Sequence, residues 1–299
     1  MSSMHGITRA DMQAVHLPRR RAVNRVMEVL ATLTALLAVA ILVIVVWSVA
    51  KRGAGALDLN LITKNPVPFA FGPVEQGLAN AFAGSLVLVG LATLMALPTG
   101  ILIALYLTEY APRAVRAGVS LVLDVLNGIP AIVIGIFVFG LVVVGRGQSG
   151  YAGAFALACL MLPLVTRSTM EVLLLVPGAL REASLALGVT RWRTTLSIVL
   201  PQTIGGVLTG TVLAVARVAG ETAPLLFTSS IVGQQTEWSP AHALQSIPVA
   251  IFELSESPDP ADHARAWAAA LVLLLFILLT SLAARWLATR GRRRLSTSR

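Results

Sequence analysis

Two charged side chains, Arg217 and Glu221, lie four positions apart in a segment that is otherwise apolar, residues 203–228. A charged side chain near the centre of a bilayer costs roughly 2.5–3.5 kcal/mol on insertion scales. Two such charges in one membrane segment indicate a function in which something polar crosses the membrane. The pair therefore indicates transport before any other motif is considered.

If residues 203–228 form one helix, positions three and four apart share a face. The face with the charged pair is small and polar: Thr203, Gly206, Gly210, Ala214, Arg217, Gly220, Glu221, Pro224 and Thr228. The opposite face is apolar: Leu208, Val212, Val215, Ala219 and Leu226. We expect the charged face to look inward, because intramembrane charges face a bundle interior or a watery path.

Two interpretations of the pair remain open. In the first, Arg217 and Glu221 form a buried ion pair that locks two helices together. In the second, the Arg217 guanidinium binds a tetrahedral oxyanion at a subunit interface, since guanidinium matches such anions bidentately and stays charged at any relevant pH. Glu221 would then offset the cation when the anion is absent. Both interpretations can hold in different states of one transport cycle.

Two further charges lie close to the predicted membrane helices. Arg167 is expected at the cytoplasmic end of the fourth helix, either as a snorkelling anchor or as a contact on the exit path of the anion. Asp124, early in the third helix, is expected to cap a helix or to hydrogen-bond between helices, without a part in transport. No metal site is expected, because the histidines are scattered along the chain: His5, His16, His242 and His263.

The composition is that of an all-α membrane protein. Of the 299 residues, 56% are hydrophobic and only 12% are charged, whereas soluble domains carry about 25% charged residues. A membrane-spanning helix needs about 20 mostly apolar residues. Six segments qualify, and together they define a transmembrane domain over residues 29–288: 29–50, 78–107, 119–144, 147–167, 203–228 and 266–286.

The net charge of +9 predicts an orientation and not a nucleic-acid partner. Arginines are concentrated in the N-terminal segment 1–28, in the tail 289–299 and in the loops 108–118 and 167–199. Because an excess of Lys and Arg marks the cytoplasmic side, both termini are predicted to be cytoplasmic. The apolar segment 29–50 exceeds the roughly 7–15 residues of a signal-peptide core, so a retained helix is expected.

Two extramembrane segments have features of their own. Residues 171–200 predict two short helices around a glycine turn, with Pro177 in the first helical turn, Gly188 at a C-terminal cap and Thr190 at the next N-cap. Pro201 is expected to end or kink the second helix. Exposed apolar residues on a cytoplasmic loop usually meet a partner, and this loop has Leu180, Ala183, Leu185, Leu187, Val189 and Trp192. The last outer loop predicts a short interfacial helix near 243–254, and the outer loop 51–75 has no assigned role.

The spacing within 171–200 resembles the Glu-Ala-Ala signature of ABC-importer permeases. Its elements are Glu182-Ala183-Ser184, then Gly188, then Ile198-Val199-Leu200-Pro201, with Ser184 in place of the second alanine. The resemblance implies the type I importer fold, in which a coupling helix with Glu182, Ala183, Ser184 and Gly188 docks on a cytoplasmic ATPase.

The chain has no phosphate-binding loop of its own. Such a loop needs Gly-Lys-Ser/Thr, whereas Lys51 precedes Arg52 and Lys64 precedes Asn65. The chain is therefore expected to be a transport subunit and not an enzyme. ATP and Mg are expected on a separate ATPase.

The stretch 216–228, Ala-Arg-Val-Ala-Gly-Glu-Thr-Ala-Pro-Leu-Leu-Phe-Thr, resembles the PstA family of permeases from the phosphate-specific ABC importer. Four other stretches share the resemblance: 128–135, 162–169, 180–192 and 246–252. It implies an inner-membrane phosphate permease that pairs with a second permease (PstC-like). It also implies an ATPase dimer (PstB-like) and an extracytoplasmic phosphate-binding protein (PstS-like). For such a permease, we expect the substrate path to include Arg217, Glu221, Thr222 and Arg167.

Other functions remain open from the sequence. A permease of the same fold for another oxyanion, such as sulfate, molybdate or phosphonate, would share the loop spacing. An ion-coupled transporter or channel would need no ATPase. A third alternative is a membrane scaffold or phosphate sensor that transports nothing.

Overall fold

The computed structural model describes residues 17–67, 76–230 and 235–296, and every regular element in these residues is helical. The first α-helices are α2 (Leu17–Gly53), α3 (Leu59–Thr63), α4 (Ala79–Leu105), α5 (Arg113–Gly128), α6 (Ala131–Val138) and α7 (Gly150–Leu174). The remaining α-helices are α8 (Gly178–Ala186), α9 (Arg191–Thr194), α10 (Leu200–Val218), α11 (Ala223–Thr228), α12 (Ile247–Glu256) and α13 (Pro260–Ser296). Short 3-10 or π-helical turns are η1 (Ala54–Ala56), η2 (Tyr106–Tyr110), η3 (Phe139–Val143) and η4 (Thr195–Val199). The expected segments 1–28, 51–75 and 289–299 lie partly outside the described residues.

Five helical segments are long and apolar enough to cross a membrane: 20–56, 79–110, 150–174, 191–218 and 260–286. The bent pair α5 and α6 with η3 makes a sixth when it is counted as one span. This agrees with the six spans predicted from hydropathy. Helix α2 contains the whole apolar segment 29–50, and its residues up to Lys51 belong to a separate unit of the chain.

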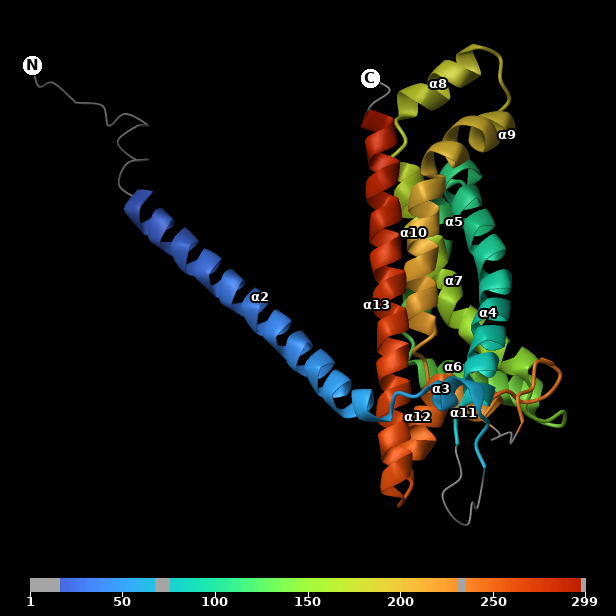
Figure 1. Cartoon of the computed structure of the whole chain (residues 1–299). Coiled ribbons are helices and arrows are strands. Elements are labelled where there is room, and N and C mark those ends of the chain that lie inside the picture. Colours follow the sequence, from blue (N-terminus) through green and yellow to red (C-terminus); the bar gives the residue numbers. More distant parts are fainter. Residues whose placement is uncertain (1–16, 68–75, 231–234, 297–299) are drawn as a thin grey trace, which may run out of the picture. The chain divides into compact units, whose positions relative to one another are not determined.

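In the second unit, residues 52–299, helix α7 packs against both α4 and α10, and α10 also packs against α13 (Figure 1). The core between α4, α7 and α10 is formed by fully buried apolar side chains, including Leu88, Leu157, Met161, Val165 and Val218. Helices α8 and α9 lie at one end of this bundle, and α6, α11 and α12 lie towards the other (Figure 1).

Helix α7 is longer than the sequence indicated. Ser149 caps its start, because the side-chain oxygen accepts a hydrogen bond from the Ala152 amide at 3.2 Å. The helix runs through Pro163 and ends at Leu174, well beyond the expected end at 167. Arg167 is therefore inside the helix and not at its end.

The third expected span is not one straight helix. Helix α5 ends at Gly128, α6 begins at Ala131, and the two segments are bent by 99°. Pro130 explains the break, because a proline disfavours helical backbone in the residue before it, and Ile129 is extended at φ −70°, ψ 129°. The continuous helix predicted over 119–144 is therefore wrong.

The fifth expected span differs at both ends. It starts at Arg191, since α9, η4 and α10 form one segment, and Pro201 lies in the first turn of α10 without ending it. At the other end α10 stops at Val218, and α11 begins only at Ala223. The single helix predicted over 203–228 is therefore wrong, because residues 219–222 interrupt it.

The two half-helices beyond these breaks pack against each other. A Cβ atom on Gly135 of α6 would lie 2.6 Å from the Pro224 Cα of α11, so only glycine permits this approach. The rings of Phe139 and Phe227 meet edge to face, with their centroids 6.5 Å apart. The contact joins the second halves of two broken spans.

Helix α12 confirms the short helix expected near 243–254, displaced slightly to Ile247–Glu256. The Asn80 amide donates to the Gln245 oxygen at 2.7 Å, and the Gln245 amide donates to Glu253 Oε2 at 2.6 Å. Burial raises the pKa of Glu253, against the opposing effect of the Gln245 hydrogen bond. These bonds tie α12 to the start of α4.

Candidate functional site

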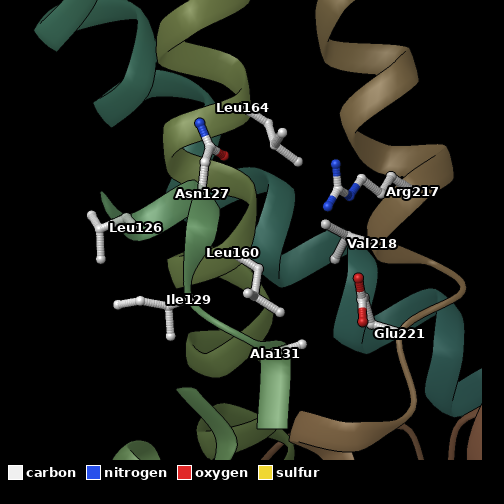
Figure 2. Close-up of a pocket in the computed structure, with 9 residues that line it drawn as sticks. All are labelled: Leu126, Asn127, Ile129, Ala131, Leu160, Leu164, Arg217, Val218 and Glu221. Atoms are coloured by element: carbon white, nitrogen blue, oxygen red, sulfur yellow. The ribbon is translucent and has the colours of Figure 1, made fainter. Parts of the chain in front are cut away.

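A pocket lies where the two broken spans approach α7 (Figure 2). The bend between α5 and α6, the end of α10 with the break after it, and the middle of α7 all contribute walls. The lining residues are Leu126, Asn127, Ile129, Ala131, Leu160, Leu164, Arg217, Val218 and Glu221. Since Leu160 and Leu164 lie near the middle of α7, the pocket sits about halfway along this core helix.

The pocket brings Arg217 and Glu221 together in a way that the sequence did not predict. Arg217 is in the last turn of α10, whereas Glu221 is in the break before α11, so the two do not share the face of one helix. Both side chains point towards the pocket (Figure 2). Among the described residues Arg217 makes no ion pair, with Glu221 or with any other carboxylate, and its side chain is exposed. The buried ion pair is therefore not formed in this conformation.

Asn127 is a pocket residue that the sequence analysis missed. It lies near the end of α5, and its exposed side-chain amide stands across the pocket from Arg217 (Figure 2). An amide offers two N–H donors and one acceptor oxygen. The signal that could have found it is Asn127-Gly128-Ile129-Pro130, a helix-breaking sequence within an apolar span.

The small face of α10 does pack closely, as expected. Gly206 faces the Val172 side chain and Gly210 faces Ser168, both on α7. Leu208, on the face expected to be apolar, is exposed. Small residues thus allow α10 to approach α7, which places Arg217 at the rim of the pocket and not inside the packed core.

Arg167 lies beside the pocket and does not line it. Its Nη2 donates to the Ser120 carbonyl at 2.9 Å and pairs with the Asp124 carboxylate, both on α5. These contacts tie Arg167 to α5, and the interhelical bond expected of Asp124 is confirmed. Because Arg167 follows Leu164 by three residues, it lies one helical turn from the pocket, towards α8.

Thr222 is adjacent to Glu221 but does not line the pocket. It is the N-cap residue of α11, and its carbonyl accepts hydrogen bonds from the amides of Leu225 and Leu226 at 3.1 and 3.2 Å. Thr222 thus starts α11 directly after the break, and the neighbouring Glu221 amide donates to the Val218 carbonyl at 3.1 Å.

The loop 171–200 has the two short helices and the glycine turn that the sequence predicted. Gly188 has φ +79°, a left-handed conformation that favours glycine after a helix, and Thr190 is the N-cap residue of α9. Glu182 and Ala183 are exposed on α8. Ser184 is buried and shares a hydrogen bond of 2.8 Å with Thr194, which ties α8 to α9. The serine at this motif position therefore makes a contact that alanine could not make.

The outward surface of this loop is strongly apolar. The exposed fraction is 84% for Leu187 and 55% for Trp192, and Leu180 and Leu185 are also exposed. Such an exposed apolar patch on a loop outside the helical bundle indicates a protein contact.

In the part of the chain that the structure describes, no group of three or more His, Cys, Asp or Glu side chains could hold a metal ion.

The membrane-spanning helices and a family match together define the class as an inner-membrane permease. Residues 96–293 match the family described as "binding-protein-dependent transport system inner membrane component". The match covers most of the chain, so the chain belongs to this family, whose members are transport components and not enzymes.

Within that class the chain is similar to PstA proteins. It is 40% identical to the phosphate transport system permease protein PstA of Yersinia pestis over 89% of this chain and 90% of that protein. For PstA of Haemophilus influenzae the identity is 39% over 87% and 91%, and for PstA 1 of Mycobacterium tuberculosis it is 38% over 92% and 91%. The resemblance seen in the sequence is confirmed.

Solved structures share the fold at low identity. A bacterial alginate ABC transporter in complex with an alginate pentasaccharide-bound periplasmic protein matches with a TM-score of 0.55 and 17% identity, over 90% of this chain and 96% of that one. The inward-facing MetNI methionine ABC transporter matches with a TM-score of 0.54 and 18% identity, over 71% and 93%. These likenesses confirm the type I ABC importer permease fold.

Proposed function

We propose that the chain is the transmembrane permease subunit of an ATP-driven inorganic phosphate importer and that it forms the translocation path with a second permease. The observation that carries the proposal is the exposed guanidinium of Arg217, which has no ion-pair partner among the described residues and faces a pocket between two broken spans. Non-helical backbone at membrane depth is tolerated where it is buried in protein or lines a watery cavity. The PstA relatives supply the substrate class.

Arg217 and Asn127 act together on the anion. The guanidinium supplies charge and a planar pair of donors, and the Asn127 amide adds neutral donors from the opposite wall. Glu221 offsets the cation when the pocket is empty, so that phosphate does not remain trapped. Thr222 holds Glu221 in position. Arg167, one turn along α7 towards α8, receives the anion on its exit path.

The loop with Glu182, Ala183, Ser184 and Gly188 couples the path to ATP hydrolysis. Its apolar patch docks on a separate ATPase dimer (PstB-like) that holds ATP and Mg. Both termini and this loop are cytoplasmic, in line with the arginine distribution. An extracytoplasmic phosphate-binding protein (PstS-like) delivers phosphate at the opposite end, and a PstC-like permease completes the path.

Phosphate uptake in cells tests the substrate. Cells that lack the chain should take up little radiolabelled phosphate at micromolar concentration, and restoring the chain should recover uptake that ignores unlabelled sulfate and is blocked by vanadate. Competition by sulfate, molybdate or phosphonate would instead make the chain a permease for another oxyanion. Uptake that depends on the chain but resists vanadate would indicate a transporter without an ATPase.

A further inference from the structure

Arg181 precedes Glu182 in α8, and its side chain joins α8 to the ends of the core helices α4 and α7. Its Nε and Nη2 donate to both oxygens of Glu109, at distances of 2.8–3.2 Å. Its Nη1 donates to the Val176 carbonyl at 2.6 Å, and Nη2 also donates to the Leu173 carbonyl at 2.9 Å. Glu109 is in η2, which continues α4, and Leu173 is in the last turn of α7.

The surroundings make this contact the main polar link between α8 and the bundle. Helix α8 packs chiefly on α9 and η4, which belong to the same loop. Only Ser184 of α8 is buried, and its hydrogen bond stays within the loop. The Arg181 and Glu109 side chains are only 23% and 11% exposed, so water screens their attraction weakly.

The geometry of the contact requires arginine. A guanidinium presents a rigid fork that matches a carboxylate bidentately, and its remaining N–H groups reach the carbonyls that a helix end leaves without intrahelical donors. A lysine has a single compact charge and cannot make this set of bonds together. The contact is therefore stiff: moving α8 moves the end of α7 and the end of α4 with it.

We propose that Arg181 is the positioning residue that transmits movement of α8 to α4 and α7, and through α7 to the pocket wall formed by Leu160 and Leu164. The inference rests on the proposed function, because it takes α8 as the helix that the ATPase moves. In this view docking and transmission are separate tasks: the exposed face of α8 binds the ATPase, and Arg181 delivers the movement.

The experiment measures phosphate transported per ATP hydrolysed, with the complete importer reconstituted in vesicles. Arg181→Gln should lower this ratio at least about tenfold, the factor that corresponds to one charge-assisted hydrogen bond, while ATPase copurification stays at the wild-type level. In Arg181→Lys the ratio of phosphate transported to ATP hydrolysed should lie between those of Arg181→Gln and the wild type. Glu109→Gln, which keeps the shape of the side chain, should give a smaller fall.

The double variant R181Q/E109Q tests whether the two side chains act as one unit. Its ratio should be no lower than that of Arg181→Gln alone, because residues that share one interaction are non-additive. Arg113→Gln is the matched control, since Arg113 is an exposed arginine at the same end of the bundle. Its ratio should stay at the wild-type value.

Three results would overturn the inference: an unchanged ratio in both Arg181→Gln and Glu109→Gln, loss of the ATPase from Arg181→Gln, or additive effects in the double variant. If the Arg181→Gln permease does not accumulate in the membrane at all, the Glu109→Gln ratio decides the matter alone, and an unchanged ratio in that variant overturns the inference. A wild-type complex that hydrolyses ATP without moving phosphate would instead defeat the proposed function, so the two failures are distinguishable.

Discussion

Two arginines, Arg181 at one end of the bundle and Arg217 about halfway along it, have opposite surroundings. Arg181 makes five hydrogen bonds, three with the Glu109 carboxylate and one with each of two carbonyls, and its side chain is mostly buried. Arg217 makes no ion pair among the described residues and points into a pocket. A guanidinium whose donors are all used can hold parts of a protein together, whereas one whose donors are free can bind something that arrives. Burial and partners thus separate a structural cation from a binding one, although both are arginines near membrane helices.

The largest effect on phosphate uptake is expected when Arg217 is replaced. Arg217→Gln should reduce phosphate uptake at least about a hundredfold, as expected when one partner of a charge-assisted contact is removed, while the complex still assembles. Uptake assays and copurification of the subunits measure this. The control is Arg146→Gln, because Arg146 lies in an exposed turn. This variant should take up phosphate at the wild-type rate. Normal uptake by Arg217→Gln would remove Arg217 from the path.

Glu221 should act on release more than on binding. Replacing it with Gln removes the negative charge near Arg217, so the anion should be held more tightly and the maximal uptake rate should fall about tenfold. Purified Glu221→Gln complex should retain more phosphate than the wild-type complex, and Glu221→Asp should resemble the wild type. Less retained phosphate in Glu221→Gln would show that Glu221 does not balance the cation.

The glycine turn of the coupling loop should give a smaller effect, caused by backbone conformation alone. A Cβ on Gly188 would meet no atom within 4 Å, yet φ is +79°, which costs a β-branched residue about 1–2 kcal/mol. Gly188→Val should therefore lower ATPase copurification about fivefold. Gly188→Asn should be milder, because asparagine tolerates this conformation. Equal losses from both variants would mean that side-chain size matters and backbone strain does not.

The smallest effects are expected at the partly exposed pair beside the pocket. The side chains of Arg167 and Asp124 are 29% and 61% exposed, and such pairs contribute about 0–1 kcal/mol. Asp124→Asn should change uptake less than about twofold, whereas Arg167→Gln should lower it about threefold if the anion contacts Arg167 on its way out. Equal uptake rates for the two variants would assign Arg167 a structural role only.

Hydropathy predicted the number of spans. The capping residues and the glycine of the loop 171–200 predicted its two short helices, since these features depend on local sequence alone. The breaks at Ile129 and at residues 219–222 were missed because an apolar window carries no information about backbone direction, although Pro130 and Gly220 were visible. The pairs of Arg167 with Asp124 and Arg181 with Glu109 join residues far apart in sequence. No pattern within a single segment could have found them, and only packing of α7 against its neighbours brings them together.

The break after Val218 has a consequence for how the protein is made. Residues 219–222 connect α10 to α11 through turns in which Gly220 bonds back to Arg217 and Glu221 to Val218, beside the exposed Arg217 side chain. Because an arginine that faces hydrocarbon is costly, a newly inserted chain without a partner over this break would be destabilised in the bilayer. We therefore expect unassembled copies to be cleared by membrane proteases, so that the cell's supply of this subunit follows synthesis of the partner that covers the break.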